Sequence, residues 1–202
     1  MQKVFPPLIS ILFHPMFMPV YGLLILFNSG TFVSYIPYDA KKYIFLIVLI
    51  CTVLLPASFI PFYLFRKIIN NIHMSTNKER IIPLIIHCLF FYLAYVFLNK
   101  LHIPAVLISY MLACAITVFL ALLVTIKWKI SLHMVGIGGL IGTVIIFSIR
   151  LGIDLKTIWM ILILFAGLTG YSRLASNSHN PSQIYAGFLL GFLSVSGVLL
   201  IG

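Results

Sequence analysis

Acidic residues are scarce in this sequence. Of its 202 residues only three are acidic, Asp39, Glu79 and Asp154, and all charged residues together make up 8%. A soluble domain carries roughly 25% charged residues, so these side chains could not cover a water-facing surface. The composition excludes a soluble enzyme, a disordered chain and a nucleic-acid-binding module. With so few carboxylates, an all-carboxylate metal site and paired-carboxylate catalysis are also excluded.

Groups that bind metals or carry redox chemistry are also missing at the required spacings. Cys51, Cys88 and Cys114 each stand alone in a different apolar segment, without the paired spacing of a metal or redox centre. The six His residues lack the close spacing of a membrane di-iron site. We therefore expect no metal and no cofactor.

Apolar residues make up 62% of the chain and gather in long runs. A membrane-spanning helix needs about 20 mostly apolar residues, so the sequence predicts an all-α, polytopic transmembrane helix bundle of six or seven spans. Residues 1–202 are expected to form a single transmembrane domain. The seven candidate segments are about 4–27, 43–65, 81–98, 103–126, 130–149, 155–171 and 184–201.

The first apolar segment is the uncertain span. It contains Pro6, Pro7, Pro15 and Pro19, which predict either a kink or an interfacial start. It lacks the short apolar stretch and small-residue cleavage site of a secretory signal, and we expect it to be retained.

Seven spans would place the N-terminus and the connections 66–80, 127–129 and 172–183 on one membrane face, because two crossings separate each from the next. That face carries eight Lys and Arg residues and the other five, which weakly favours a cytoplasmic location for the first face. If Arg80 and Arg173 bind a ligand, the count becomes six against five, and the orientation stays open.

Polar residues are concentrated where loops meet apolar segments, and three clusters stand out. The richest runs from Tyr171 to Gly191 and contains Ser172, Arg173, His179 and Gln183. Asn180 before Pro181 is typical of a helix cap. Because Gln183 follows His179 by four residues, the two side chains can meet on one helix face.

The other two clusters are shorter. Ser131 and His133 open the fifth apolar segment, and Lys78, Glu79 and Arg80 precede the third, where Thr76 or Asn77 could cap a helix. Taken singly, each cluster also fits an ordinary interfacial loop.

Together the clusters place two arginines and two imidazoles, Arg80, Arg173, His133 and His179, on one membrane face. Arginine supplies planar, bidentate donors for phosphate oxygens. One imidazole can attack phosphorus and the other can protonate the leaving oxygen. These are the parts that bind and hydrolyse a phosphate without a metal.

The spacing also resembles that of a known family. Ser172-Arg173, five residues, then His179 is similar to the third motif of the type 2 phosphatidic acid phosphatase superfamily, which reads Ser-Arg, five residues, His, three residues, Asp. Ser131-x-His133 resembles its second motif, Pro-Ser-Gly-His. Glu79-Arg80 with Pro83 vaguely resembles its first, Lys, six residues, Arg-Pro. The resemblance covers a core of about residues 75–195, and only the third motif is specific.

The resemblance implies a membrane-embedded phosphatase. His179 would be the nucleophile that forms a phosphohistidine, oriented by Gln183, and His133 would be the general acid. The phosphate-binding residues it suggests are Arg173, Arg80, Ser131, Lys78 and Ser172. By the family's usual habitat and the compact chain, we expect a multi-pass protein of the bacterial inner membrane.

Three positions depart from the family pattern: His73 stands in place of Lys, Ile81 in place of Pro, and Gln183 in place of the Asp. Two functions therefore stay open. The first is metal-independent hydrolysis of a lipid phosphate or prenyl diphosphate. The second is a catalytically degenerate homologue that binds anionic lipid or serves a structural role. Nucleic acid is not an expected partner. The spans contain no Asp, Glu, Lys or Arg away from their ends, which argues against an ion-coupled transporter.

Small residues predict how the two histidine-bearing helices meet. Gly138 and Gly142, and likewise Gly187 and Gly191, have the spacing that lets membrane helices approach closely. We expect these helices to contact one another, or neighbours lined with Ser and Ala, and so to bring the loops of His133 and His179 together. His14 and His87 lie within apolar segments, where we expect each to bond a neighbouring carbonyl or water.

Overall fold

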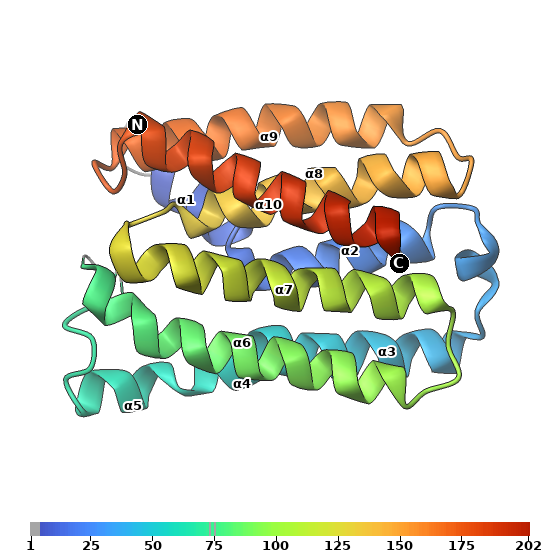
Figure 1. The fold of residues 1–202 in the computed structure, drawn as a ribbon, viewed down its shortest axis with the longest axis horizontal. Coiled ribbons are helices and arrows are strands. Elements are labelled where there is room, and N and C mark those ends of the chain that lie inside the picture. Colours follow the sequence, from blue (N-terminus) through green and yellow to red (C-terminus); the bar gives the residue numbers. More distant parts are fainter. Residues whose placement is uncertain (1–4, 73, 75) are drawn as a thin grey trace.

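A computed structural model describes residues 5–72, 74 and 76–202, with side chains from residue 9 onward. His73, the departure from the first motif, lies outside the described residues. The described chain is helical throughout, and the long helices run side by side (Figure 1). In chain order the elements are α1 (Phe5–Leu12), η1 (Pro15–Phe17), α2 (Met18–Phe27), η2 (Phe32–Tyr35), α3 (Tyr38–Leu49), η3 (Ile50–Leu54), α4 (Leu55–Ser58), α5 (Ile60–Phe65), α6 (Asn77–Asn99), α7 (Ala105–Lys127), α8 (Leu132–Arg150), α9 (Lys156–Ala175) and α10 (Pro181–Ile201).

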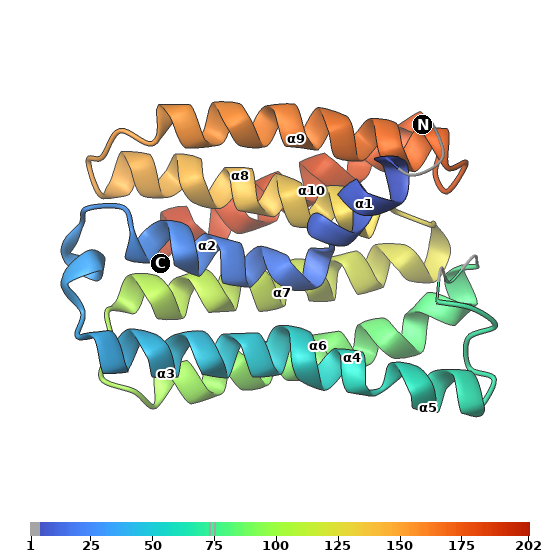
Figure 2. The same ribbon diagram turned by 180° about the vertical axis from the view of Figure 1, so that it is seen from behind.

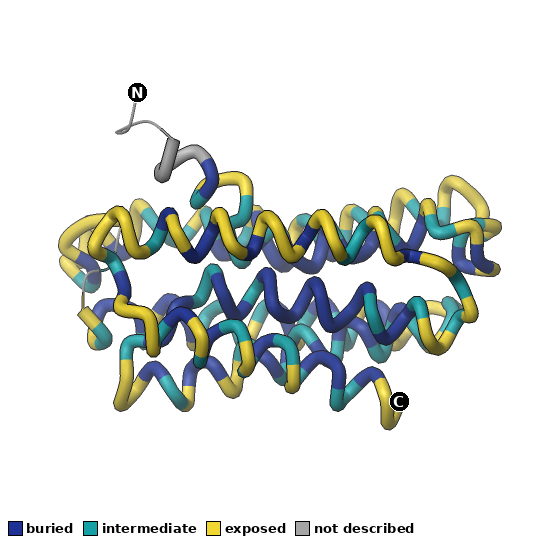
Figure 3. Tube along the Cα trace, turned by 90° about the horizontal axis from the view of Figure 1, so that it is seen from above, coloured by how far each residue is buried: buried dark blue, intermediate teal, exposed yellow. Residues whose placement is uncertain are grey.

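Seven of these helical stretches are long and apolar enough to cross a membrane, so the protein is a multi-pass integral membrane protein with seven candidate spans. The expected six or seven spans therefore become seven. Exposed residues cover the outer sides of the bundle and buried ones lie between the helices (Figure 3). The spans are Ile9–Phe27, Tyr38–Phe65, Asn77–Asn99, Ala105–Lys127, Leu132–Arg150, Lys156–Ala175 and Pro181–Ile201.

The first span is broken at His14 and Pro15, as the prolines predicted. The Nδ1 atom of His14 accepts a hydrogen bond from the Met16 N–H at 3.4 Å. Beyond this break α2 packs on α8, whereas α1 lies at an angle to α2 and packs on α9 (Figure 2). The kink therefore folds the start of the chain over the end of α9.

Several helices extend beyond the apolar runs that predicted them. α6 begins at Asn77 and α9 ends at Ala175, where we had expected about residues 81 and 171. Helix α6 starts early because Thr76 caps it: the Thr76 side chain accepts from the Glu79 N–H, and the Glu79 side chain accepts from the Thr76 N–H. Arg80 and Arg173 therefore lie in the terminal turns of helices and not in loops.

The prediction that alternate connections gather at one end of the bundle is confirmed. Connections 66–76, 128–131 and 176–180 lie together at one end of the bundle, on the left in Figure 1, and α1 lies there too. We call this the polar end. Connections 28–37, 100–104 and 151–155 lie at the other end, which we call the opposite end.

Glycines bring α8 and α10 into backbone contact, which confirms the predicted packing. A Cβ atom placed on Gly191 would lie 1.9 Å from the carbonyl oxygen of Val135, and one on Gly138 would lie 2.3 Å from that of Phe188. Gly187 is equally constrained, because its Cβ would lie 2.7 Å from the carbonyl oxygen of Ser131. Only glycine allows this approach.

Candidate functional site

The turn between α9 and α10 explains the spacing of Arg173 and His179. Asn177 adopts a left-handed conformation with φ of 50°. Its N–H donates to the Leu174 carbonyl, and the Ser178 N–H donates to the Arg173 carbonyl, which together close α9 in a Schellman motif. Asn180 then caps α10, as predicted, by accepting from the Gln183 N–H at 2.9 Å. His179 is therefore held between two helix caps.

Gln183 holds the ring of His179. Its Oε1 atom lies 3.1 Å from His179 Nδ1 and also accepts from the Asn180 N–H at 3.3 Å. Because a backbone N–H can only donate, the Gln183 atom facing it must be the amide oxygen. That oxygen can only accept, so Nδ1 of His179 carries the proton, and Nε2 keeps its lone pair.

The connection 128–131 is fixed from two sides. Arg80 donates from its guanidinium to the Ile130 carbonyl at 3.3 Å and from Nε to the Met74 carbonyl at 2.9 Å. The Ser131 N–H donates to the Gln183 carbonyl at 3.2 Å. The start of α8 is thereby attached to both α6 and α10.

Helix α1 supplies a third set of contacts, through Ser10. The Ser10 carbonyl lies 3.0 Å from His133 Nε2, and its hydroxyl accepts from the Arg173 guanidinium at 3.2 Å. The same hydroxyl lies 3.0 Å from that of Ser172. His14 adds an edge-to-face contact with His133, with ring centroids 5.2 Å apart. Residues about 120 to 160 positions apart in the chain therefore meet here.

These elements surround a cavity of about 740 Å³. Arg80, His133, Arg173 and His179 all line it, together with Lys129, Ser10, His14 and His87. Between the spans the lining is mostly apolar, although Thr117, Thr143 and His87 also contribute to it. The apolar side chains there include Phe91, Val118, Leu140 and Val195. The cavity therefore joins a cationic mouth to an apolar interior.

The cavity mouth carries positive charge that the described carboxylates only partly offset. Burial, with the nearby charges of Arg80 and Arg173, lowers the pKa of Lys129 below its ordinary value, although Glu79 acts in the opposite direction. Burial and the charge of Arg80 lower the pKa of His179 from 6.5 to about 4, against the effect of its hydrogen bond to Gln183. His179 is therefore neutral at pH 7, and a bound anion would relieve the repulsion among the cations.

Two predicted site residues lie elsewhere. Lys78 is exposed and is absent from the cavity lining. Ser131 is fully buried, its hydroxyl has no hydrogen-bond partner among the described residues, and it does not line the cavity either. Ser172 and Gln183 do not line the cavity but hydrogen-bond residues that do. Four of the eight predicted site residues thus face the cavity directly.

Ser10 and Lys129 were not predicted to be site residues, and His14 was expected only to bond a neighbour. A polar residue within an apolar segment often indicates a functional site in a membrane protein. Ser10 and His14 are both such residues. His87 bonds the Pro83 carbonyl at 2.7 Å, as expected, while its ring also lines the cavity.

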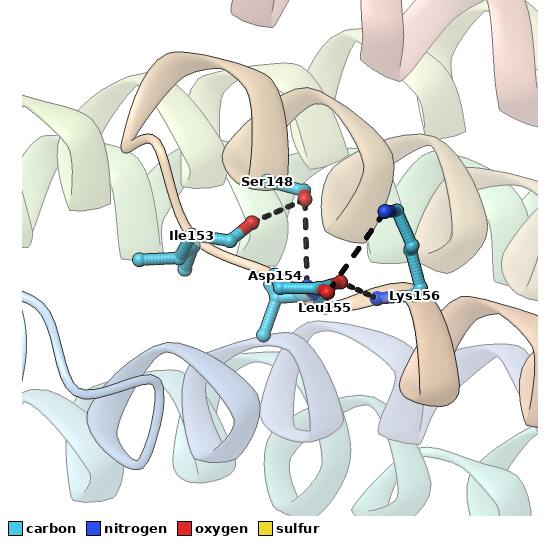
Figure 4. A network of polar contacts seen from close by, with 5 residues as sticks. All are labelled: Ser148, Ile153, Asp154, Leu155 and Lys156. Atoms are coloured by element: carbon cyan, nitrogen blue, oxygen red, sulfur yellow. Dashed lines mark hydrogen bonds and ion pairs between the residues drawn. The ribbon is translucent and has the colours of Figure 1, made fainter.

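The partner of His179 Nδ1 is Gln183 and not one of the three acids. Asp154 instead stabilises the turn before α9 at the opposite end (Figure 4), and Asp39 lies in the first turn of α3. Glu79 caps α6 and accepts from the Asn70 side chain. Among the described residues, no group of three His, Cys, Asp or Glu side chains could hold a metal ion.

Comparison with protein families, with curated proteins and with solved structures finds no match to this chain.

Proposed function

We propose that this integral membrane protein hydrolyses the phosphate or diphosphate of a lipid through a phosphohistidine on His179. The observation that carries the proposal is the state of that ring. Its Nδ1–H is held by Gln183, so the Nε2 lone pair is available at a cavity that Arg80, Lys129 and Arg173 also line. A neutral imidazole beside three cations suits attack on a bound phosphate.

The proposed reaction has two steps. His179 Nε2 attacks phosphorus, the bond from phosphorus to the lipid oxygen breaks, and His133 gives a proton to that oxygen. A water molecule then attacks the phosphorus of the phosphohistidine while His133 takes a proton from it, the bond from phosphorus to His179 Nε2 breaks, and inorganic phosphate leaves. The negative charge of the substrate favours a protonated imidazole beside it, and Arg80, Lys129 and Arg173 would stabilise the charge that develops on the phosphate.

The shape of the cavity supports a lipid substrate. Its mouth is cationic and its interior is apolar, so an amphipathic molecule with a phosphate head and an apolar tail matches both parts. The resemblance to the type 2 phosphatidic acid phosphatase superfamily supports the same substrate class, and a place in a bacterial inner membrane belongs to the same proposal.

One observation favours a second function, a degenerate homologue that binds anionic lipid without turnover. Gln183 reproduces the hydrogen bond of the family's Asp but brings no negative charge to stabilise a positively charged His179. In the serine-protease triad the corresponding Asp-to-Asn change costs about 10⁴ in rate. The two functions share the binding site and differ only in turnover.

Release of inorganic phosphate separates them. The purified protein in detergent, with EDTA present, is given phosphatidate, phosphatidylglycerol phosphate and a polyprenyl diphosphate. Turnover that is lost in His179→Ala supports the phosphatase. No turnover in the parent, with turnover gained in Gln183→Asp, would establish the degenerate function. No turnover in any folded variant would reject hydrolysis of these lipids.

A further inference from the structure

The family pattern assigns a serine hydroxyl to the phosphate, and the residue at that position here, Ser131, does not face the cavity. Ser131 is fully buried and its hydroxyl does not line the cavity. In contrast, Ser10 of α1 lines the cavity next to Arg173. The kink at His14 and Pro15 folds α1 over α9 and so brings this serine to the polar end.

We propose that Ser10 provides the phosphate-binding hydroxyl of this site, in the role that the resemblance gives to Ser131. The proposal rests on the proposed function in that it assumes a phosphate ligand, but it concerns binding and does not require turnover. It makes the N-terminal helix part of the site and not merely a membrane anchor.

The hydrogen-bonding capacity of Ser10 suits this role. A serine hydroxyl has one donor and two acceptor positions. Arg173 occupies one acceptor position from 3.2 Å, and when the Ser172 hydroxyl, 3.0 Å away, donates to the second, the Ser10 O–H is left to donate to a phosphate oxygen. Arg173 would bind the same phosphate, since its guanidinium carries several donors in one plane.

The backbone of Ser10 contributes as well. Its carbonyl can only accept, so the hydrogen bond of 3.0 Å to His133 requires a proton on His133 Nε2. This holds the His133 ring, through Nε2, next to the residue whose hydroxyl would bind the phosphate. One residue of α1 therefore positions the general acid and contacts the ligand.

The test measures binding of dodecyl phosphate to the full-length protein in detergent, with dodecanol as the matched ligand without phosphate. Ser10→Ala should weaken dodecyl phosphate binding about tenfold or more, because it removes a hydrogen bond to a charged group, and should leave dodecanol binding unchanged. Ser10→Thr keeps the hydroxyl and should retain most of the affinity. Ser131→Ala should lose less than Ser10→Ala, and Ser182→Ala, at an exposed site in α10, is the control.

Three results would overturn the inference. Ser131→Ala could lose more affinity than Ser10→Ala. Ser10→Ala could bind dodecyl phosphate more tightly, which would show that Ser10 competes with phosphate for Arg173. Both ligands could weaken equally, which would show a structural role. If Ser10→Ala does not fold, Ser10→Cys provides the comparison, since a thiol is a weak donor of similar size.

Measuring turnover of the parent distinguishes failure of the phosphatase proposal from failure of the Ser10 proposal. No phosphate release from the parent, together with the expected loss of affinity in Ser10→Ala, would reject the phosphatase and support the role of Ser10. If the parent releases phosphate and Ser10→Ala binds dodecyl phosphate as tightly as the parent, the phosphatase is supported and the role of Ser10 is rejected. A parent that binds no dodecyl phosphate would overturn the role of Ser10.

Discussion

The two ends of the bundle use their charged residues differently. At the opposite end Lys156 lies 3.9 Å from Asp154, both side chains are more than 70% exposed, and Asp154 also accepts from the Lys156 N–H at 2.9 Å (Figure 4). At the polar end Arg80, Lys129 and Arg173 share one cavity mouth. A lysine at the opposite end is paired with an acid within a local turn, whereas three cations at the polar end surround one cavity.

The difference indicates which end is suited to binding an anionic ligand. A charge in water gains little from a partner, so the ion pair beside α9 matters only for its turn. Charges withdrawn from water repel one another unless an anion arrives. The polar end is therefore the end that an anionic head group would stabilise. Comparing matched substitutions at the two ends tests this directly.

The largest expected effect is loss of the proposed nucleophile. His179→Ala should lower phosphate release by about 10⁴-fold or more, the scale seen when a nucleophile is removed. His102→Ala, an exposed histidine at the opposite end, is the matched control and should keep the parent rate. Initial rates with a lipid phosphate substrate measure both, and equal rates in the two variants would contradict the role of His179.

The next largest effect concerns the contact that holds the polar end together. Gly191→Ala would place a methyl group 1.9 Å from the Val135 carbonyl, and overpacking of this kind costs about 1–3 kcal/mol. Gly197→Ala, on the same helix towards the opposite end, meets nothing within 4 Å and should be neutral or stabilise α10 by up to about 1 kcal/mol. Thermal unfolding in detergent compares the two. A Gly191→Ala protein as stable as the parent would disprove the close contact of α8 with α10.

A smaller effect is expected on the pH dependence. Burial and the charge of Arg80 lower the pKa of His179 to about 4, so the ring stays neutral, and able to attack, down to that pH. The acidic limb of kcat/KM, which reports the free protein, should therefore fall near pH 4 in the parent. Gln183→Asp adds a negative charge that favours the imidazolium, so its acidic limb should move to higher pH. An unchanged limb would show that residue 183 does not interact with His179.

The smallest effect is expected at the opposite end. Asp154→Asn removes the exposed ion pair with Lys156 but keeps a side chain that can accept from the Lys156 N–H. It should change the free energy of unfolding by less than about 0.5 kcal/mol and leave dodecyl phosphate affinity unchanged. Destabilisation comparable to that of Gly191→Ala would mean that the two ends contribute equally to the structure.

The sequence alone predicted six or seven spans, a kink or an interfacial start in the proline-containing first segment, the cap at Asn180, the meeting of His179 with Gln183 and close packing of the two histidine-bearing helices. These features depend on local patterns. Apolar length sets a span, proline interrupts a helix, a four-residue separation brings two side chains to one helix face, and glycine spacing permits helix contact. Helix ends were less accurate, because capped polar turns extend α6 and α9 beyond their apolar runs.

Only the tertiary structure decided which polar side chains reach the cavity. Ser10 meets Ser172 across 162 positions of sequence, because α1 folds back over α9, and no local pattern encodes that fold. Similarly Lys129 lines the cavity whereas Lys78 is exposed. Residue type and spacing show that the polar end has cations and hydroxyls, but the packing of distant helices determines which of them face a ligand.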